Sequence, residues 1–115
     1  MKTNVVINDQ FWLVLDKLVN TSKLQIDRQK GSRHPRYPSI IYPLDYGFLE
    51  STTSGDGDGI DVWVGSLPNK TLNAIAVTVD LVKRDSEIKL LLGCTDEEIT
   101  IISEFLNSGE MNAII

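Results

Sequence analysis

Proline and glycine interrupt the middle of this chain so often that it cannot hold a long helix there. Three prolines and two glycines lie between positions 31 and 47, and a second turn-rich stretch, STTSGDGDG, follows at 51–59. Proline has no backbone donor, and both residue types favour turns over regular structure. The chain therefore predicts short strands joined by loops.

The positions of these strands are predicted from short apolar runs and from the alternation of apolar and polar residues. Extended segments are expected, in chain order, at 23–27, 60–65, 73–82 and 87–94. The third has an apolar residue at every second position, which is the period of a strand, at Ile75, Val77, Val79 and Leu81. A turn at 83–86 joins it to the fourth.

A helix is predicted near each end. Apolar residues recur at helical spacing over 8–20, with Asn8 as the cap. TDEE at 95–98 is a capping box that opens a final helix, expected to end near Gly109. With 115 residues and no repeat or linker, the chain is expected to form one domain, 1–115. The predicted fold class is mainly β, a small barrel of about five strands with the two helices packed outside.

The distribution of charge suggests a site. Between Lys23 and Arg36 lie five basic residues and the only histidine, whereas 45–61 contains five acids and no Lys or Arg. These stretches are either two solvated surfaces or the two walls of a site that holds an anion and a cation. The net charge of -5 argues against a nucleic-acid partner.

The sequence also predicts a location. No apolar run is long enough to cross a membrane, and the N-terminus has no apolar segment typical of a secretory signal. The single cysteine, Cys94, excludes an intramolecular disulfide framework and a cysteine-based zinc site. We therefore expect a cytoplasmic protein without a membrane partner.

The clearest chemical signal is DGDGID at 56–61. Its three carboxylates repel one another unless water or a shared cation screens them, and the glycines allow the backbone turns that bring oxygens together. Such oxygens suit Mg²⁺, Ca²⁺ or Mn²⁺. A polar turn is the alternative. An EF-hand does not fit, because Asp61 and Leu67 stand where its glycine and glutamate belong.

A second charged group lies on the predicted hairpin. Asp85, Glu87 and Lys89 share one face of a strand. They are either exposed surface charges or, if they face the acidic loop, two further metal ligands and a substrate-binding lysine. Tyr46 is either a packed strand residue or a donor to a phosphate oxygen.

These segments together resemble the family I soluble inorganic pyrophosphatases. Tyr-Pro-x-x-Tyr-Gly-Phe at 42–48 and Asp-Gly-Asp-x-x-Asp-Val at 56–62 follow that family's signature in order and spacing. The resemblance implies an OB-like barrel and magnesium-dependent hydrolysis of pyrophosphate to two phosphates by a metal-activated water. It implies that Asp58 holds or deprotonates the water, that Asp56, Asp61, Asp85 and Glu87 bind several Mg²⁺ ions, and that Lys23, Tyr46, Lys89 and one of Arg28 and Arg36 bind phosphate.

The chain departs from this pattern in several places. Gln25 stands where a glutamate is usual, Gly59 replaces a proline, and Phe105-Leu-Asn107 occupies the place of a phosphate-binding Tyr-Lys pair. These departures leave two alternatives open: a weak or inactive relative that binds phosphate or pyrophosphate, and a hydrolase of another phosphoanhydride. His34 is interpreted as an exposed loop residue, with contact to phosphate as the alternative. The two tryptophans and the apolar C-terminus suggest a homo-oligomer.

Overall fold

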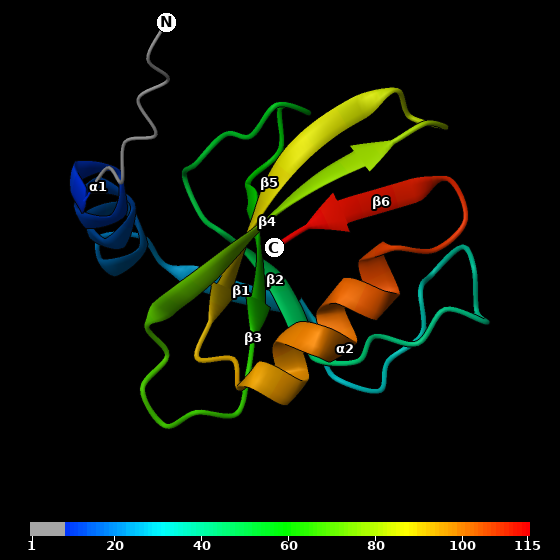
Figure 1. Cartoon of the computed structure of the whole chain (residues 1–115), viewed down its shortest axis with the longest axis horizontal. Coiled ribbons are helices and arrows are strands. Elements are labelled where there is room, and N and C mark those ends of the chain that lie inside the picture. Colours follow the sequence, from blue (N-terminus) through cyan, green and yellow to red (C-terminus); the bar gives the residue numbers. More distant parts are fainter. Residues whose placement is uncertain (1–8) are drawn as a thin grey trace, which may run out of the picture.

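A computed structural model describes residues 9–115, which form one open sheet with a helix near each end (Figure 1). The elements are α1 (Asp9–Asn20), β1 (Leu24–Arg28), β2 (Asp45–Leu49), β3 (Ile60–Val64), β4 (Leu72–Asp80), β5 (Asp85–Leu92), α2 (Asp96–Leu106) and β6 (Met111–Ile114). The predicted cap Asn8 lies outside the described residues. Neither of these helices has the length and apolarity needed to cross a bilayer.

The sheet has the strand order β1-β2-β3-β5-β4-β6. β3 and β5 run parallel, and every other neighbouring pair is antiparallel. The predicted mainly β, OB-like fold with two helices is confirmed. Among the described residues the sheet has six strands rather than about five and stays open, with β1 and β6 at its edges.

The chain after α2 differs from the prediction. The helix ends at Leu106 rather than near Gly109, because Asn107 leaves the helical dihedral angles, with φ −103° and ψ 62°. Gly109 then takes a positive φ of 60°, which turns the chain back as β6 along β4. The Asn107 side chain holds this turn, because its Oδ1 accepts a hydrogen bond from the Ala113 N–H at 2.9 Å.

The central strands bury apolar side chains on both faces of the sheet. Trp63 and Leu91 belong to a cluster that includes the inner face of α2. Val62 and Leu90 belong to a second cluster, against which α1 packs with partly buried residues. The parallel pairing of β3 with β5 sets these residues side by side. Burial on both faces explains why the paired segments, 62–64 of β3 and 90–92 of β5, are continuous apolar runs.

The alternating apolar residues of β4 are not its most buried positions. Ala76 and Thr78 are buried, whereas Val79 is 49% exposed. Ala76 belongs to the cluster beneath α2, and Thr78 borders the cleft described below. The alternation therefore predicts the strand correctly, but the side of β4 that faces the interior carries its smaller residues.

Glu98 joins the start of α2 to the sheet. Its backbone N–H donates to Thr95 Oγ1 at 3.1 Å and its Oε1 accepts from the Thr95 N–H at 2.8 Å, which confirms the predicted capping box. The same Oε1 accepts from the Ser66 N–H at 3.1 Å, after the end of β3. Burial by itself raises the pKa of Glu98, but the hydrogen bonds from Thr95 and Ser66 outweigh it and lower that pKa below its usual value.

We expect Glu98→Ala to lower the free energy of unfolding by about 1–3 kcal/mol at neutral pH, because two backbone donors lose their acceptor. The lowered pKa means that the carboxylate stabilises the fold above its unfolded-state pKa, and that this contribution is lost as the pH falls through the folded-state pKa. The difference in the free energy of unfolding between the wild type and Glu98→Ala should therefore be smaller at acidic pH. Urea unfolding at neutral and acidic pH measures it, with Glu97→Ala on the same turn as the control. Equal stability at neutral pH would contradict the prediction.

Candidate active site

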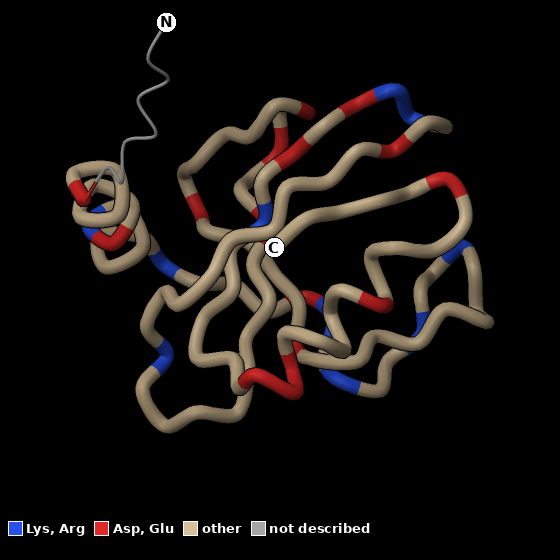
Figure 2. The backbone as a smooth tube through the Cα atoms, in the orientation of Figure 1, with Lys and Arg blue, Asp and Glu red and all other residues tan. Residues whose placement is uncertain are grey.

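An open cleft of about 680 Å³ lies where β2, β3 and β5 meet the loops at 29–42 and 54–59. One part is lined by carboxylates, which we call the acidic wall: Asp56, Asp58, Asp61, Asp85 and Glu87. Another part is lined by Arg28 and His34, which we call the basic wall. Figure 2 shows acidic positions along the β4–β5 hairpin and the neighbouring loop. The basic and acidic stretches of the sequence thus supply side chains to one cleft.

Asp56 organises the acidic loop. Its Oδ1 accepts hydrogen bonds from Ser54 Oγ at 2.6 Å and from the Asp58 N–H at 2.9 Å. Gly57 takes a φ of 88°, a conformation that residues with side chains rarely adopt. The Ser54 hydroxyl, followed by the Asp58 N–H, lowers the pKa of Asp56. The loop is therefore a folded turn whose first carboxylate is ionised at neutral pH.

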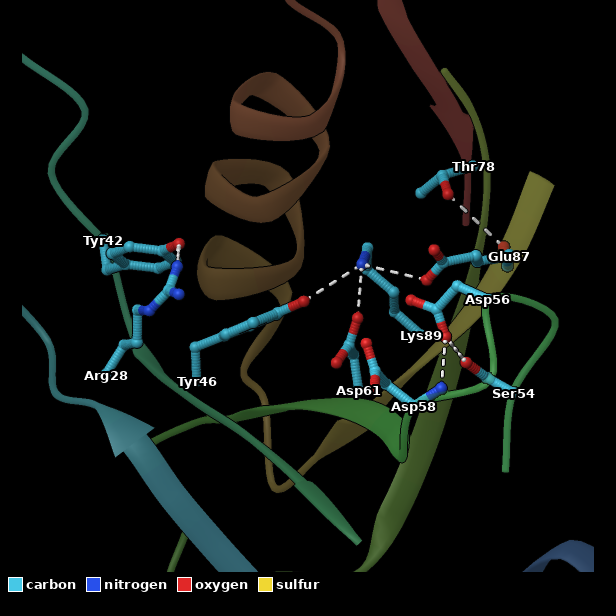
Figure 3. A network of polar contacts seen from close by, with 10 residues as sticks. All are labelled: Arg28, Tyr42, Tyr46, Ser54, Asp56, Asp58, Asp61, Thr78, Glu87 and Lys89. Atoms are coloured by element: carbon cyan, nitrogen blue, oxygen red, sulfur yellow. Dashed lines mark hydrogen bonds and ion pairs between the residues drawn. The ribbon is translucent and has the colours of Figure 1, made fainter. Parts of the chain in front are cut away.

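Lys89 lies at the centre of the acidic wall (Figure 3). Its Nζ is 2.9 Å from Asp61 Oδ2 and 3.7 Å from Glu87 Oε2, and it donates to Tyr46 Oη at 3.0 Å. These four residues come from three neighbouring strands, β2, β3 and β5. Lys89 is 7% exposed, so its charge acts on these groups with little solvent between them. The lysine therefore holds together carboxylates that would otherwise repel one another.

The titration of the neighbouring groups reflects this crowding. Burial, with the charges of the other carboxylates in the acidic wall, raises the pKa of Glu87, although Lys89 acts in the opposite direction. Burial and then the adjacent Asp61 raise the pKa of Tyr46 far above its usual value. Tyr46 therefore keeps its proton and remains a hydrogen-bond donor. The acidic wall carries more negative charge than Lys89 neutralises, which favours a bound cation.

The basic wall is built on aromatic rings. Arg28 Nη1 donates to Tyr42 Oη, and the Arg28 guanidinium carbon lies 5.3 Å from the centre of the Tyr42 ring. Tyr42 is buried and in turn contacts Tyr46 and Trp63, with ring centroids 5.5 and 6.0 Å away. This stack connects the basic wall to the residues around Lys89 and fixes the position of the Arg28 charge.

Most of the residues predicted for the site line the cleft: Arg28, Tyr46, Asp56, Asp58, Asp61, Asp85, Glu87 and Lys89. Lys23 and Arg36 do not. Lys23 is an exposed residue 4.0 Å from Glu50 across the β1–β2 pair, and Arg36 is exposed on the 29–42 loop. The chemical roles of all ten stay predictions.

Several residues that line the cleft were not predicted as site residues. His34, Tyr42, Trp63 and Phe105 all border it. Tyr42 could have been assigned, because it stands in the Tyr-Pro motif. Trp63 and Phe105 give no such signal, since apolar residues of a strand and a helix are equally expected in the core.

The acidic wall has the right chemistry for a divalent ion. Its donors are all carboxylate oxygens, which suit Mg²⁺. Within residues 9–115 no three His, Cys, Asp or Glu side chains are gathered closely enough to form a metal site as they stand. Lys89 Nζ instead lies between two of these carboxylates, at a point where positive charge is stabilised.

Comparison with known proteins agrees with the motifs. A family model described as inorganic pyrophosphatase matches residues 17–83. A relative named inorganic pyrophosphatase, from Aeropyrum pernix, is 40% identical over 47 residues, which is 37% of this chain and 27% of the relative. The chain therefore covers little more than a quarter of that relative.

Proposed function

This chain belongs to the inorganic pyrophosphatase family, and from that premise we propose that it hydrolyses inorganic pyrophosphate to two phosphates with magnesium as cofactor. One observation carries the proposal. Carboxylates from two segments, 56–61 and 85–87, line the same cleft as a buried lysine and an arginine. A pyrophosphate with its metal ions needs both signs of charge in one place.

The donor set fits magnesium. Asp56, Asp61, Asp85 and Glu87 would supply the oxygens that hold the ions, as the family resemblance implies. Bound Mg²⁺ lowers the pKa of water and neutralises charge on a leaving phosphate. Because Lys89 already lies between Asp61 and Glu87, we infer that these side chains rearrange when the ions bind.

The other predicted site residues would orient the attacking water and bind the phosphate groups. Asp58 borders the cleft, and within residues 9–115 its side-chain oxygens make no hydrogen bond, so its carboxylate can accept a proton from water. Lys89, Arg28 and the Tyr46 phenol would hold phosphate oxygens through charge-assisted hydrogen bonds. The resemblance also assigns Lys23 to phosphate and gives Arg36 as the alternative to Arg28, although Lys23 and Arg36 both lie outside the cleft. The homo-oligomer and the cytoplasmic location stay predictions.

We expect the purified chain to release phosphate from pyrophosphate when Mg²⁺ is present, and EDTA to abolish the release. Excess Mg²⁺ should restore it, because the acidic wall needs a cation to accept an anionic substrate. A colourimetric phosphate assay measures this.

The same assay separates the alternatives. A chain that binds pyrophosphate in calorimetry but releases no phosphate would be a binding relative. Release from a nucleoside triphosphate or another phosphoanhydride, without release from pyrophosphate, would identify a different substrate. In either case the proposed activity is wrong.

A further inference from the structure

The one histidine of the chain lies in the cleft with its ring held on two sides. His34 stands on the loop between β1 and β2, and its ring is nearly parallel to that of Tyr42, with a centroid distance of 6.3 Å and an interplanar angle of 12°. The Tyr37 ring contacts it at 5.1 Å. The backbone N–H of His34 also donates a hydrogen bond to the Ile40 carbonyl at 2.9 Å across the loop. The sequence alone predicts an exposed loop residue, whereas His34 is a partly exposed residue that borders the cleft.

One ring nitrogen of His34 is already used by the loop. Nδ1 accepts a hydrogen bond from the Arg36 N–H at 3.0 Å and a longer one from the Tyr37 N–H at 3.3 Å. A nitrogen that accepts cannot carry a proton, so the proton of the neutral ring is on Nε2. Within residues 9–115 no hydrogen bond is found for Nε2. The loop therefore fixes the tautomer and leaves one N–H donor for a ligand in the cleft.

The charges around His34 define the ligand that this donor suits. Arg28 lines the same part of the cleft, and the charges of Arg36 and Lys83 also reach the ring. Burial, followed by these three cations, lowers the pKa of His34 and favours the neutral ring that the hydrogen bonds to Nδ1 require. A donor among cations suits an anionic acceptor, and a phosphate oxygen is such an acceptor.

We propose that His34 binds substrate, its neutral ring donating a hydrogen bond from Nε2–H to an oxygen of a phosphate held beside Arg28. This inference rests on the proposed function for its substrate. It adds a residue that contacts phosphate without adding charge, at a position set by the fold of the 29–42 loop.

Two substitutions separate the nitrogens of the ring. In His34→Asn the side-chain oxygen can take the place of Nδ1 and accept from the Arg36 and Tyr37 N–H groups, but the distal donor is lost. In His34→Gln the amide nitrogen can reach the place of Nε2. We expect His34→Asn to raise the KM for pyrophosphate about tenfold with little change in kcat, and His34→Gln to raise it by less. Ser39→Ala, on the same loop and outside the cleft, is the control and should leave KM unchanged.

A binding experiment tests the inference without turnover. Because the chain has a single histidine, the imidazole nitrogen signals in a ¹⁵N NMR spectrum of tag-free protein belong to His34 alone. We expect the free protein to show the Nε2–H tautomer and inorganic phosphate to shift the Nε2 signal, with weaker phosphate binding by His34→Asn. Each of three results would overturn the proposal: a proton on Nδ1, an Nε2 signal that does not shift when phosphate is added, or a wild-type KM in a folded His34→Asn protein. If the wild-type chain does not hydrolyse pyrophosphate, the proposed function fails, and the phosphate titration still decides the role of His34.

Discussion

Asp58→Asn is expected to lower the rate of pyrophosphate hydrolysis by roughly two to four orders of magnitude. Asparagine keeps the size of the side chain but cannot accept a proton from the attacking water. The loop should keep its shape, because the hydrogen bonds that define it use the Asp58 backbone and the Asp56 side chain. Magnesium affinity should therefore change little. Steady-state phosphate release across a range of Mg²⁺ and pyrophosphate concentrations separates the effect on kcat from the effect on binding.

Asp61→Asn is the matched comparison for this experiment. Asp61 contacts Lys89 and is expected to hold the metal, so its substitution should weaken magnesium binding as well as the rate. If Asp58→Asn retains the wild-type kcat, Asp58 is not the group that accepts the proton. If Asp61→Asn and a substitution of Lys89 also leave the kinetics unchanged, the activity lies elsewhere and the acidic loop is only a turn.

Lys89→Met is expected to raise the KM for pyrophosphate by about ten- to a hundredfold, through loss of a charge-assisted contact to phosphate. It should also destabilise the protein. Losing one partner of a fully buried ion pair costs about 3–5 kcal/mol, and because Asp61 is partly solvated we expect about 2 kcal/mol here. Methionine is close in size to lysine, so the effect reports the lost charge rather than a cavity.

Magnesium should partly reverse this destabilisation, because a divalent ion can neutralise the carboxylates that lose the ammonium. Thermal unfolding with EDTA and with excess Mg²⁺ measures the difference, and Lys17→Met on the exposed face of α1 serves as the control. The same melting temperature for Lys89→Met and the wild type in EDTA would show that the ammonium does not hold the carboxylates together.

The sequence predicts most elements because their signals are local. The capping box of Thr95 and Glu98 fixes the start of α2, and alternation is enough to identify β4. No local signal marks β6, because a strand of four residues at the edge of a sheet depends on its pairing with β4. The position of the turn before it depends on the side chain of Asn107, which reaches six residues ahead.

In the site, too, local sequence signals predict some residues and not others. Motif spacing brings Asp56, Asp58 and Asp61 together because they lie within six residues, in the loop before β3 and at the start of that strand. Strand alternation adds Glu87 and Lys89. The cations proposed to bind phosphate are harder to predict, since their positions depend on the path of a long irregular loop. Arg28 lines the cleft from the end of β1, whereas Arg36, which follows Pro35, is exposed on the loop. The hydrogen bonds that give His34 its place come from backbone groups, which sequence motifs do not describe.

The acidic wall and the basic wall come from separate stretches of the chain. Such a site can therefore change one wall in evolution while it keeps the other. The acidic wall comes from the loop before β3 and from β3 and β5, at the centre of the sheet. His34 instead belongs to a loop outside the sheet, which is closed by its own backbone hydrogen bonds, such as that from the Gly31 N–H to the Tyr42 carbonyl at 2.8 Å. Under the proposed function, substitutions in that loop can change which group is accepted beyond the scissile bond while the carboxylates of the acidic wall keep their places. If the proposed function is correct, one set of carboxylates can thereby serve a lineage of proteins that differ in the phosphoanhydride they select.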